Sequence, residues 1–184
     1  DNASGSHGGA FSVRSAYLNL DDVKVHRNTA TSNGGAMYLA YNSDMDINAV
    51  VNIKNSEFLK NESKSNGGAA YITKHSVEKE HNILTVDDTE FRENTAKNAG
   101  GALLFTAGSK AYMTDVTFAG NQALNSDKGD GAAISLGGSD TTVEIDGAVF
   151  KDNIAKNNGG VISAKSGSKL ILNDAEATGN KASS

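Results

Sequence analysis

The stretch Phe91-Arg92-Glu93-Asn94-Thr95-Ala96-Lys97-Asn98-Ala99-Gly100-Gly101-Ala102-Leu103 contains a pattern that recurs along the whole chain. An aromatic or apolar residue is followed by Asn three positions later, by a small residue two positions after that, and then by Gly-Gly before an apolar run. The asparagine recurs as Asn2, Asn28, Asn61, Asn94, Asn121, Asn153 and Asn180, and the glycine that opens the apolar run recurs as Gly9, Gly35, Gly68, Gly101, Gly131 and Gly160. Self-similarity with a period of about 30 residues is the signature of a solenoid protein.

Each repeat contains a segment with the two-residue periodicity of a β-strand. Apolar residues stand seven and five positions before the phenylalanine, as Leu84 and Val86 do before Phe91. A polar pair such as Asp87-Asp88 follows. Asp, Asn and Gly favour turns, so we expect a corner there, followed by a second short strand that carries the phenylalanine.

A third strand begins at the repeat glycine. We place the residues two and four positions after that glycine inside, which assigns Ala133 and Ser135 to the interior of the fifth repeat. The alternative face remains open, because both faces of this strand are apolar in the middle repeats. The assignment leaves an outward stripe of Tyr38, Tyr71, Leu104 and Ile134.

These observations predict an all-β fold, a right-handed parallel β-helix of about six coils with three short strands each. Three such strands and their corners require about 30 residues, and each strand would pair with its equivalent one coil away at about 4.8 Å. No segment keeps a helical period beyond two turns. We expect residues 1–184 to form a single β-helix segment, and the incomplete first and last repeats indicate a fragment of a longer array.

The seven recurring asparagines are expected to form a structural ladder. Stacked coils place equivalent residues above one another, and a side-chain amide can both donate to and accept from its neighbour. Aspartate would bring like charges into register. The small residue two positions later suits a tight corner, and Gly-Gly permits positive φ or a close approach of backbones.

Composition excludes several classes of function. The chain has no Cys and a net charge of -5, so it has neither disulfides nor a basic surface for nucleic acid. No apolar run approaches the roughly 18 residues that span a membrane. We expect no cofactor and no membrane insertion within this segment, and any secretion signal would lie outside it.

Two neighbouring connections are unusually long. From the repeat glycine to the next first strand they take 16 residues each, Gly35 to Val51 and Gly68 to Leu84, against 9 to 12 elsewhere. Insertions in a solenoid become loops, often on the binding face. The candidate partner-binding residues in these loops are Tyr41, Asp44, Asp46, His75, Glu78, Glu80 and His81.

Several residues could carry other chemistry. The His and Glu residues of the second loop are types that ligate metal, but their spacing matches no known site, so a solvated loop is favoured. Asp44 with Asp46, or Asp127 with Asp130, could offer oxygens to calcium, yet the full calcium-loop pattern is missing. The acidic corner pairs could serve a sugar-cleaving enzyme. However, their recurrence at one corner favours a turn, and we predict no catalytic and no metal site.

The alternation of Phe58-x-x-Asn61, Phe91-x-x-Asn94, Phe118-x-x-Asn121 and Phe150-x-x-Asn153 with Gly8-Gly-Ala-Phe11, Gly34-Gly-Ala-Met37, Gly67-Gly-Ala-Ala70 and Gly100-Gly-Ala-Leu103 resembles the FxxN and GGA[ILV] motifs of the polymorphic outer membrane protein family of autotransporters. The resemblance covers the whole chain, with departures at Val25, Ala177, Asp130 and Val161. It implies a secreted β-helical passenger, extracellular or on the cell surface, that mediates adhesion to a protein or glycan receptor on another cell. A filament module that binds copies of itself is the alternative, and a polysaccharide lyase or hydrolase ranks third.

Overall fold

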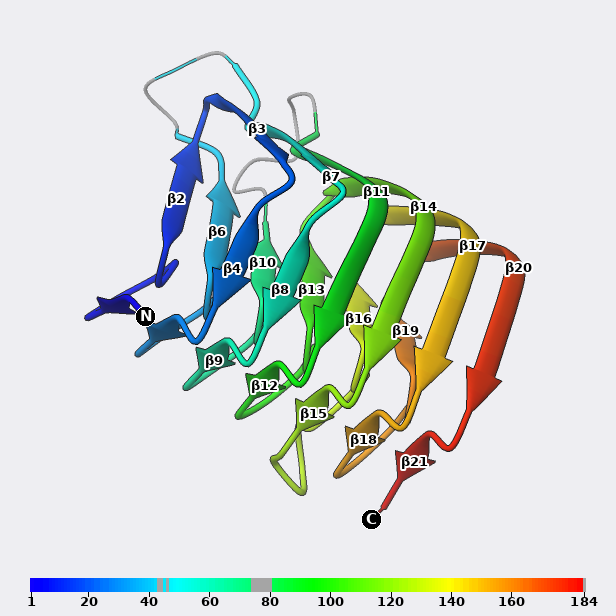
Figure 1. Cartoon of the computed structure of the whole chain (residues 1–184). Coiled ribbons are helices and arrows are strands. Elements are labelled where there is room, and N and C mark those ends of the chain that lie inside the picture. The colour runs from blue at the N-terminus through cyan, green and yellow to red at the C-terminus, as the bar shows by residue number, and fades with distance from the viewer. Residues whose placement is uncertain (43–44, 46, 74–80, 184) are drawn as a thin grey trace.

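The computed structural model describes residues 1–42, 45, 47–73 and 81–183. Within these residues the chain contains strands and no helix, and the strands form three sheets in which every pairing is parallel. Successive coils lie side by side along one axis, so that the N-terminal strands are at one end of the rod and the C-terminal strands are at the other (Figure 1). The predicted parallel β-helix is confirmed.

The three sheets run along the axis of the rod, and each takes its strands from successive coils. Sheet A contains β1 (Ala3–Ser4), β5 (Thr29–Ala30), β9 (Glu62–Ser63), β12 (Thr95–Ala96), β15 (Gln122–Ala123), β18 (Ile154–Ala155) and β21 (Lys181–Ala182). Sheet B contains β2 (Phe11–Arg14), β6 (Met37–Ala40), β10 (Ala70–Ile72), β13 (Leu103–Thr106), β16 (Ile134–Gly137) and β19 (Ile162–Lys165). Sheet C contains β3 (Tyr17–Asp21), β4 (Lys24–His26), β7 (Val50–Lys54), β8 (Glu57–Leu59), β11 (Ile83–Arg92), β14 (Lys110–Ala119), β17 (Thr142–Lys151) and β20 (Lys169–Thr178).

The corner expected between the first and second strands is a kink inside sheet C. In the last four coils both segments belong to one ten-residue strand, and only the first two coils divide it. At the kink one residue takes positive φ, such as Asp88 at 41° or Asp115 at 50°. The turn-forming residues therefore bend the strand without ending it, because the parallel pairing resumes on both sides of the kink.

Sheet A occupies the position where a tight corner was expected. The residue after the asparagine and the small residue pair with their equivalents one coil away, as Thr95 and Ala96 do with Gln122 and Ala123. The second glycine of the Gly-Gly pair, which follows each sheet A strand, allows close contact with the backbone of the following coil. A Cβ on Gly68 would lie 2.0 Å from the backbone oxygen of Gly101, which is too close for any side chain.

A column of stacked phenylalanines fills the core. Phe58, Phe91, Phe118 and Phe150 are buried, and consecutive ring centroids are 5.2, 5.0 and 5.4 Å apart. Leucine, isoleucine, valine and methionine from sheets B and C surround these rings. Because each aromatic side chain buries a large apolar area and contacts its equivalent in the next coil, the column stabilises both the coil and the stack.

Sheet B corrects the predicted register of the fifth coil. Leu103 pairs with Ile134 and Phe105 with Leu136, so Ile134 and Leu136 point inward and Ser135 lies on the outer face beside Leu104. Ala133 does lie in the core, but the expectation that Ser135 points inward was wrong, and Leu136 takes that place. The reason is that Gly131, with φ of 64°, is equivalent to Gly100 and not to Gly101, and Ala132 takes the place of the second glycine.

Candidate binding surface

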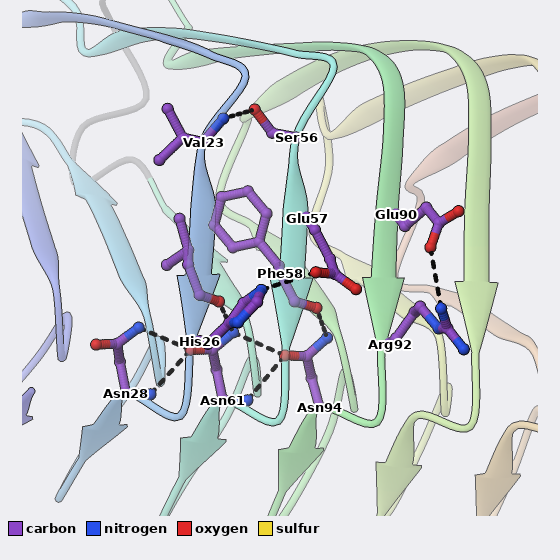
Figure 2. A network of polar contacts seen from close by, with 11 residues as sticks. Val23, His26, Asn28, Ser56, Glu57, Phe58, Asn61, Glu90, Arg92 and Asn94 are labelled. Carbon is purple, nitrogen blue, oxygen red and sulfur yellow. Dashed lines mark hydrogen bonds and ion pairs between the residues drawn. The ribbon is translucent and has the colours of Figure 1, made fainter. Parts of the chain in front are cut away.

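The seven recurring asparagines lie in one column along the corner between sheets C and A. In each pair the Oδ1 atom of one asparagine accepts hydrogen bonds from both the backbone N–H and the Nδ2 group of the asparagine one coil earlier. Asn61, for example, donates both bonds to Asn94 at 3.0 Å (Figure 2). The Nδ2 group of Asn94 also donates to the carbonyl oxygen of Phe58 at 2.9 Å. The ladder thus satisfies buried backbone groups that the chain exposes as it turns.

The two long excursions connect sheet B to sheet C in the second and third coils. They run from 41 to 49 and from 73 to 82, whereas the fourth coil makes the same connection with residues 107–109. Of the candidate contact residues, Asp44, Asp46, His75, Glu78 and Glu80 lie outside the described residues. Tyr41 and His81 are described, and both are half-buried at the bases of the excursions.

One residue that the sequence patterns did not single out, Asn82, holds the bases of the two excursions together. It is fully buried, its Oδ1 accepts from the backbone N–H of Ala49 at 2.9 Å, and its Nδ2 donates to the carbonyl oxygen of Thr73. His81 contacts the carbonyl oxygen of Gly108 through Nδ1 and so fixes the third coil to the turn of the fourth. The sequence does contain a signal for Asn82. It is a polar residue directly before the first strand of the third coil, at the position where the second coil has Ala49.

Apolar side chains that are exposed or half-buried occur beside these bases and within the first excursion. Tyr17 begins strand β3, where it is 75% exposed, and it pairs in register with Val50, which in turn pairs with Ile83. Within the first excursion Met45 is 52% exposed and Ile47 is 47% exposed. We call these five residues the loop-base patch. Exposed apolar side chains that form a contiguous patch are typical of surfaces that contact other molecules.

The outer face of sheet B carries an aromatic stack that differs from the predicted apolar stripe. His7, Tyr38 and Tyr71 stack in that order, with ring centroids 4.4 and 5.7 Å apart, and the guanidinium carbon of Arg14 lies 5.6 Å from the Tyr38 ring centroid. The stripe was expected to continue through Leu104 to Ile134. However, Leu104 is largely buried and Ile134 lies in the core.

The carboxylates of the predicted corner pairs face outward along the kink of sheet C. A shallow groove there is lined by Asp22, Asp88, Glu57 and Glu90, among other residues. Glu57 pairs with His26 at 2.8 Å, and Glu90 lies 3.4 Å from an Arg92 nitrogen (Figure 2). Each of these two carboxylates therefore has a side-chain partner on an open surface, and the aspartates at the positive-φ positions form the bend itself.

The insertion before the fifth coil is organised by its own side chains. The Oδ1 atom of Asn125 accepts from the backbone N–H groups of Asp127 and Lys128, which forms a local turn. Asp130 accepts from Lys165 Nζ at 3.0 Å and from both the backbone and side-chain nitrogens of Asn158 at 3.1 Å. Burial raises the pKa of Asp130, but these hydrogen bonds outweigh it and hold that pKa below its usual value.

Among the described residues no three His, Asp or Glu side chains gather in a way that could hold a metal ion.

Comparison with known proteins agrees with the repeat. None of the described segments is a helix long and apolar enough to cross a bilayer. Neither the curated proteins nor the solved structures yielded a match to the chain. Residues 147–165, from the kink of β17 to the end of β19, match the Chlamydia polymorphic membrane protein (Chlamydia_PMP) repeat. Over these residues the resemblance found in the sequence is confirmed, and this segment carries the repeat of the polymorphic membrane protein family, which agrees with an outer-membrane or cell-surface protein.

Proposed function

We propose that this chain is a non-catalytic adhesive module, displayed at the cell surface or outside the cell, that binds a protein receptor on another cell. The observation that supports the proposal is the loop-base patch, which lies beside the two longest connections of the solenoid. The match to a surface-protein repeat agrees with this location.

The patch has the chemistry of a protein contact. Tyr17 and Met45 present aromatic and sulfur-containing surface, the types enriched at the centres of protein interfaces. The buried amide of Asn82 ties the ends of both excursions to the rigid coils. A partner that binds there would therefore meet a base whose position is already fixed, which lowers the entropy lost on binding.

Loop grafts test the proposal without disturbing the coils. Residues 41–49 and 73–82 are each replaced by the Ala-Gly-Ser turn that the fourth coil uses at 107–109. The control graft places the same turn at 138–141, the corresponding connection of the fifth coil. Binding of the labelled proteins to cultured epithelial cells is measured by flow cytometry, and circular dichroism verifies that each variant folds.

We expect the double graft to lose cell binding and the control graft to keep it. A point variant gives a finer test: Tyr17→Ser should weaken binding several-fold, whereas Tyr112→Ser, which changes a tyrosine that is 42% exposed on the same sheet, should not. Full binding by the double graft would refute the proposal. Sedimentation velocity with self-association that rises with concentration would then favour the filament alternative.

A further inference from the structure

We propose that the outer face of sheet B in the first two coils is a separate binding site for a sugar that bears a carboxylate, formed by Arg14, His7 and Tyr38. The site does not involve the loop-base patch and is not required for the function proposed above. Its parts come from three places in the chain: the segment before β2, the end of β2, and β6.

Arg14 provides the charge. It is exposed at the end of β2, and among the described residues it forms no ion pair, although the chain has 22 acidic residues against 17 basic ones. Its guanidinium lies against the ring of Tyr38. A cation–π contact of this kind uses no N–H group, so the guanidinium keeps its N–H pairs available for two parallel hydrogen bonds with a carboxylate.

His7 provides a neutral donor. The backbone N–H of Asn33 donates to His7 Nδ1 at 3.3 Å, which leaves the ring proton of the neutral tautomer on Nε2. Burial lowers the pKa of His7, and the positive charge of Arg14 lowers it further, so the ring is neutral at pH 7. Neither Nε2 nor the Tyr38 hydroxyl has a hydrogen-bond partner among the described residues.

The surroundings favour a sugar over an acidic peptide. The exposed hydroxyl-bearing residue Ser12 lies next to Tyr38 in register, and the Tyr71 hydroxyl accepts from Thr106 one coil further on. Aromatic edges, hydroxyls and a single guanidinium match the hydroxyls and the lone carboxylate of an acidic sugar. An extended peptide would need an unpaired strand edge; β6, which carries Tyr38, is paired on both sides, but β2 lies at the end of sheet B and has a free edge. Addition of an acidic peptide to that edge is therefore the alternative that the acidic pentapeptide in the test below examines.

The test is a titration of the ¹⁵N-labelled chain with sialyllactose, followed by amide chemical shifts, with lactose as the neutral probe. We expect sialyllactose to shift amides of residues 7–14 and 37–40, and lactose to leave them unchanged. Arg14→Gln should weaken binding at least about tenfold. Arg14→Lys should weaken it nearly as much, because a lysine cannot form the two parallel hydrogen bonds that a guanidinium forms with a carboxylate. His7→Phe, which keeps a ring in the stack, should weaken it several-fold. The control Arg92→Gln changes an arginine on sheet C and should have no effect.

The site is refuted if sialyllactose causes no shifts at millimolar concentration, or if lactose or an acidic pentapeptide binds equally well. The double loop graft separates this site from the adhesive patch. It should retain the sialyllactose shifts even though it loses cell binding, and loss of the shifts in the graft would contradict the placement on sheet B.

Discussion

Replacement of Asn94 by alanine should destabilise the rod far more than any surface change. Asn94 is fully buried, and its side chain forms four hydrogen bonds, two accepted from Asn61 and one donated to each of Phe58 and Asn121. Alanine leaves the backbone N–H of Asn61 and the carbonyl of Phe58 without these partners, and each such buried group costs about 1–3 kcal/mol. Together with the small cavity, the loss in unfolding free energy should be about 3–5 kcal/mol.

Urea unfolding followed by circular dichroism measures this loss. With a denaturant dependence of about 2–3 kcal/mol per molar urea, the unfolding midpoint should fall by about 1–2 M. The matched control is Asn52→Ala, which removes an exposed amide whose Nδ2 donates to Asn19 one coil away at 2.8 Å. Because water can replace that bond, its effect should stay within about 0.5 kcal/mol. Equal effects of the two substitutions would refute the view that the buried ladder holds the coils in register.

Further predictions concern the phenylalanine core, the glycine beside sheet A, and the stability of the protein at acidic pH. Phe91→Ala should lower the unfolding free energy by about 3–5 kcal/mol in the same urea assay, because it opens a gap between two stacked rings; a change below about 1 kcal/mol would contradict the packing. Gly68→Ala should prevent folding or cost at least about 3 kcal/mol, since the new Cβ would overlap the Gly101 oxygen, whereas Ala132→Gly, at the equivalent position, should change stability by no more than about 1 kcal/mol. Hydrogen bonds from Lys165 and Asn158 hold the pKa of Asp130 below its unfolded-state value. The stability they add is therefore present above the unfolded-state pKa and is lost as the pH falls through the folded-state pKa. Asp130→Asn should make the urea midpoint less dependent on pH below about 4, and an unchanged acid dependence would count against that interaction.

Periodicity made the fold predictable. Two apolar positions separated by one residue mark a buried strand face, and Phe-x-x-Asn followed by Gly-Gly marks each turn of the solenoid. The same local chemistry did not settle where strands end. The pair Asp87-Asp88 favours a turn, yet β11 continues through a single positive-φ residue, with parallel pairing before and after it. Tertiary pairing therefore overrides a local preference that sequence alone cannot weigh.

The fifth coil and the binding surface were harder to predict. The insertion at 125–130 shifts the equivalent glycine by one position, and a shift by one exchanges the two faces of a strand. The loop-base patch brings Tyr17 of the first coil to Val50 and Ile83 through register, although more than 30 residues separate each from the next. The aromatic stack of His7 with Tyr38 depends on the same long-range geometry. Asn82 lies at another position in its coil than the ladder asparagines and bonds to the backbone of Ala49 and Thr73, so the repeat pattern does not single it out.

The most direct test of the stacked coils is the nuclear Overhauser effect between phenylalanine rings in a sample labelled only at phenylalanine. The stack predicts cross-peaks from the Phe91 ring to both Phe58 and Phe118, whose centroids lie 5.2 and 5.0 Å away although the residues are 33 and 27 positions apart in the chain. Absence of both cross-peaks in the folded protein would show that successive repeats do not lie one above another, and would contradict the β-helix.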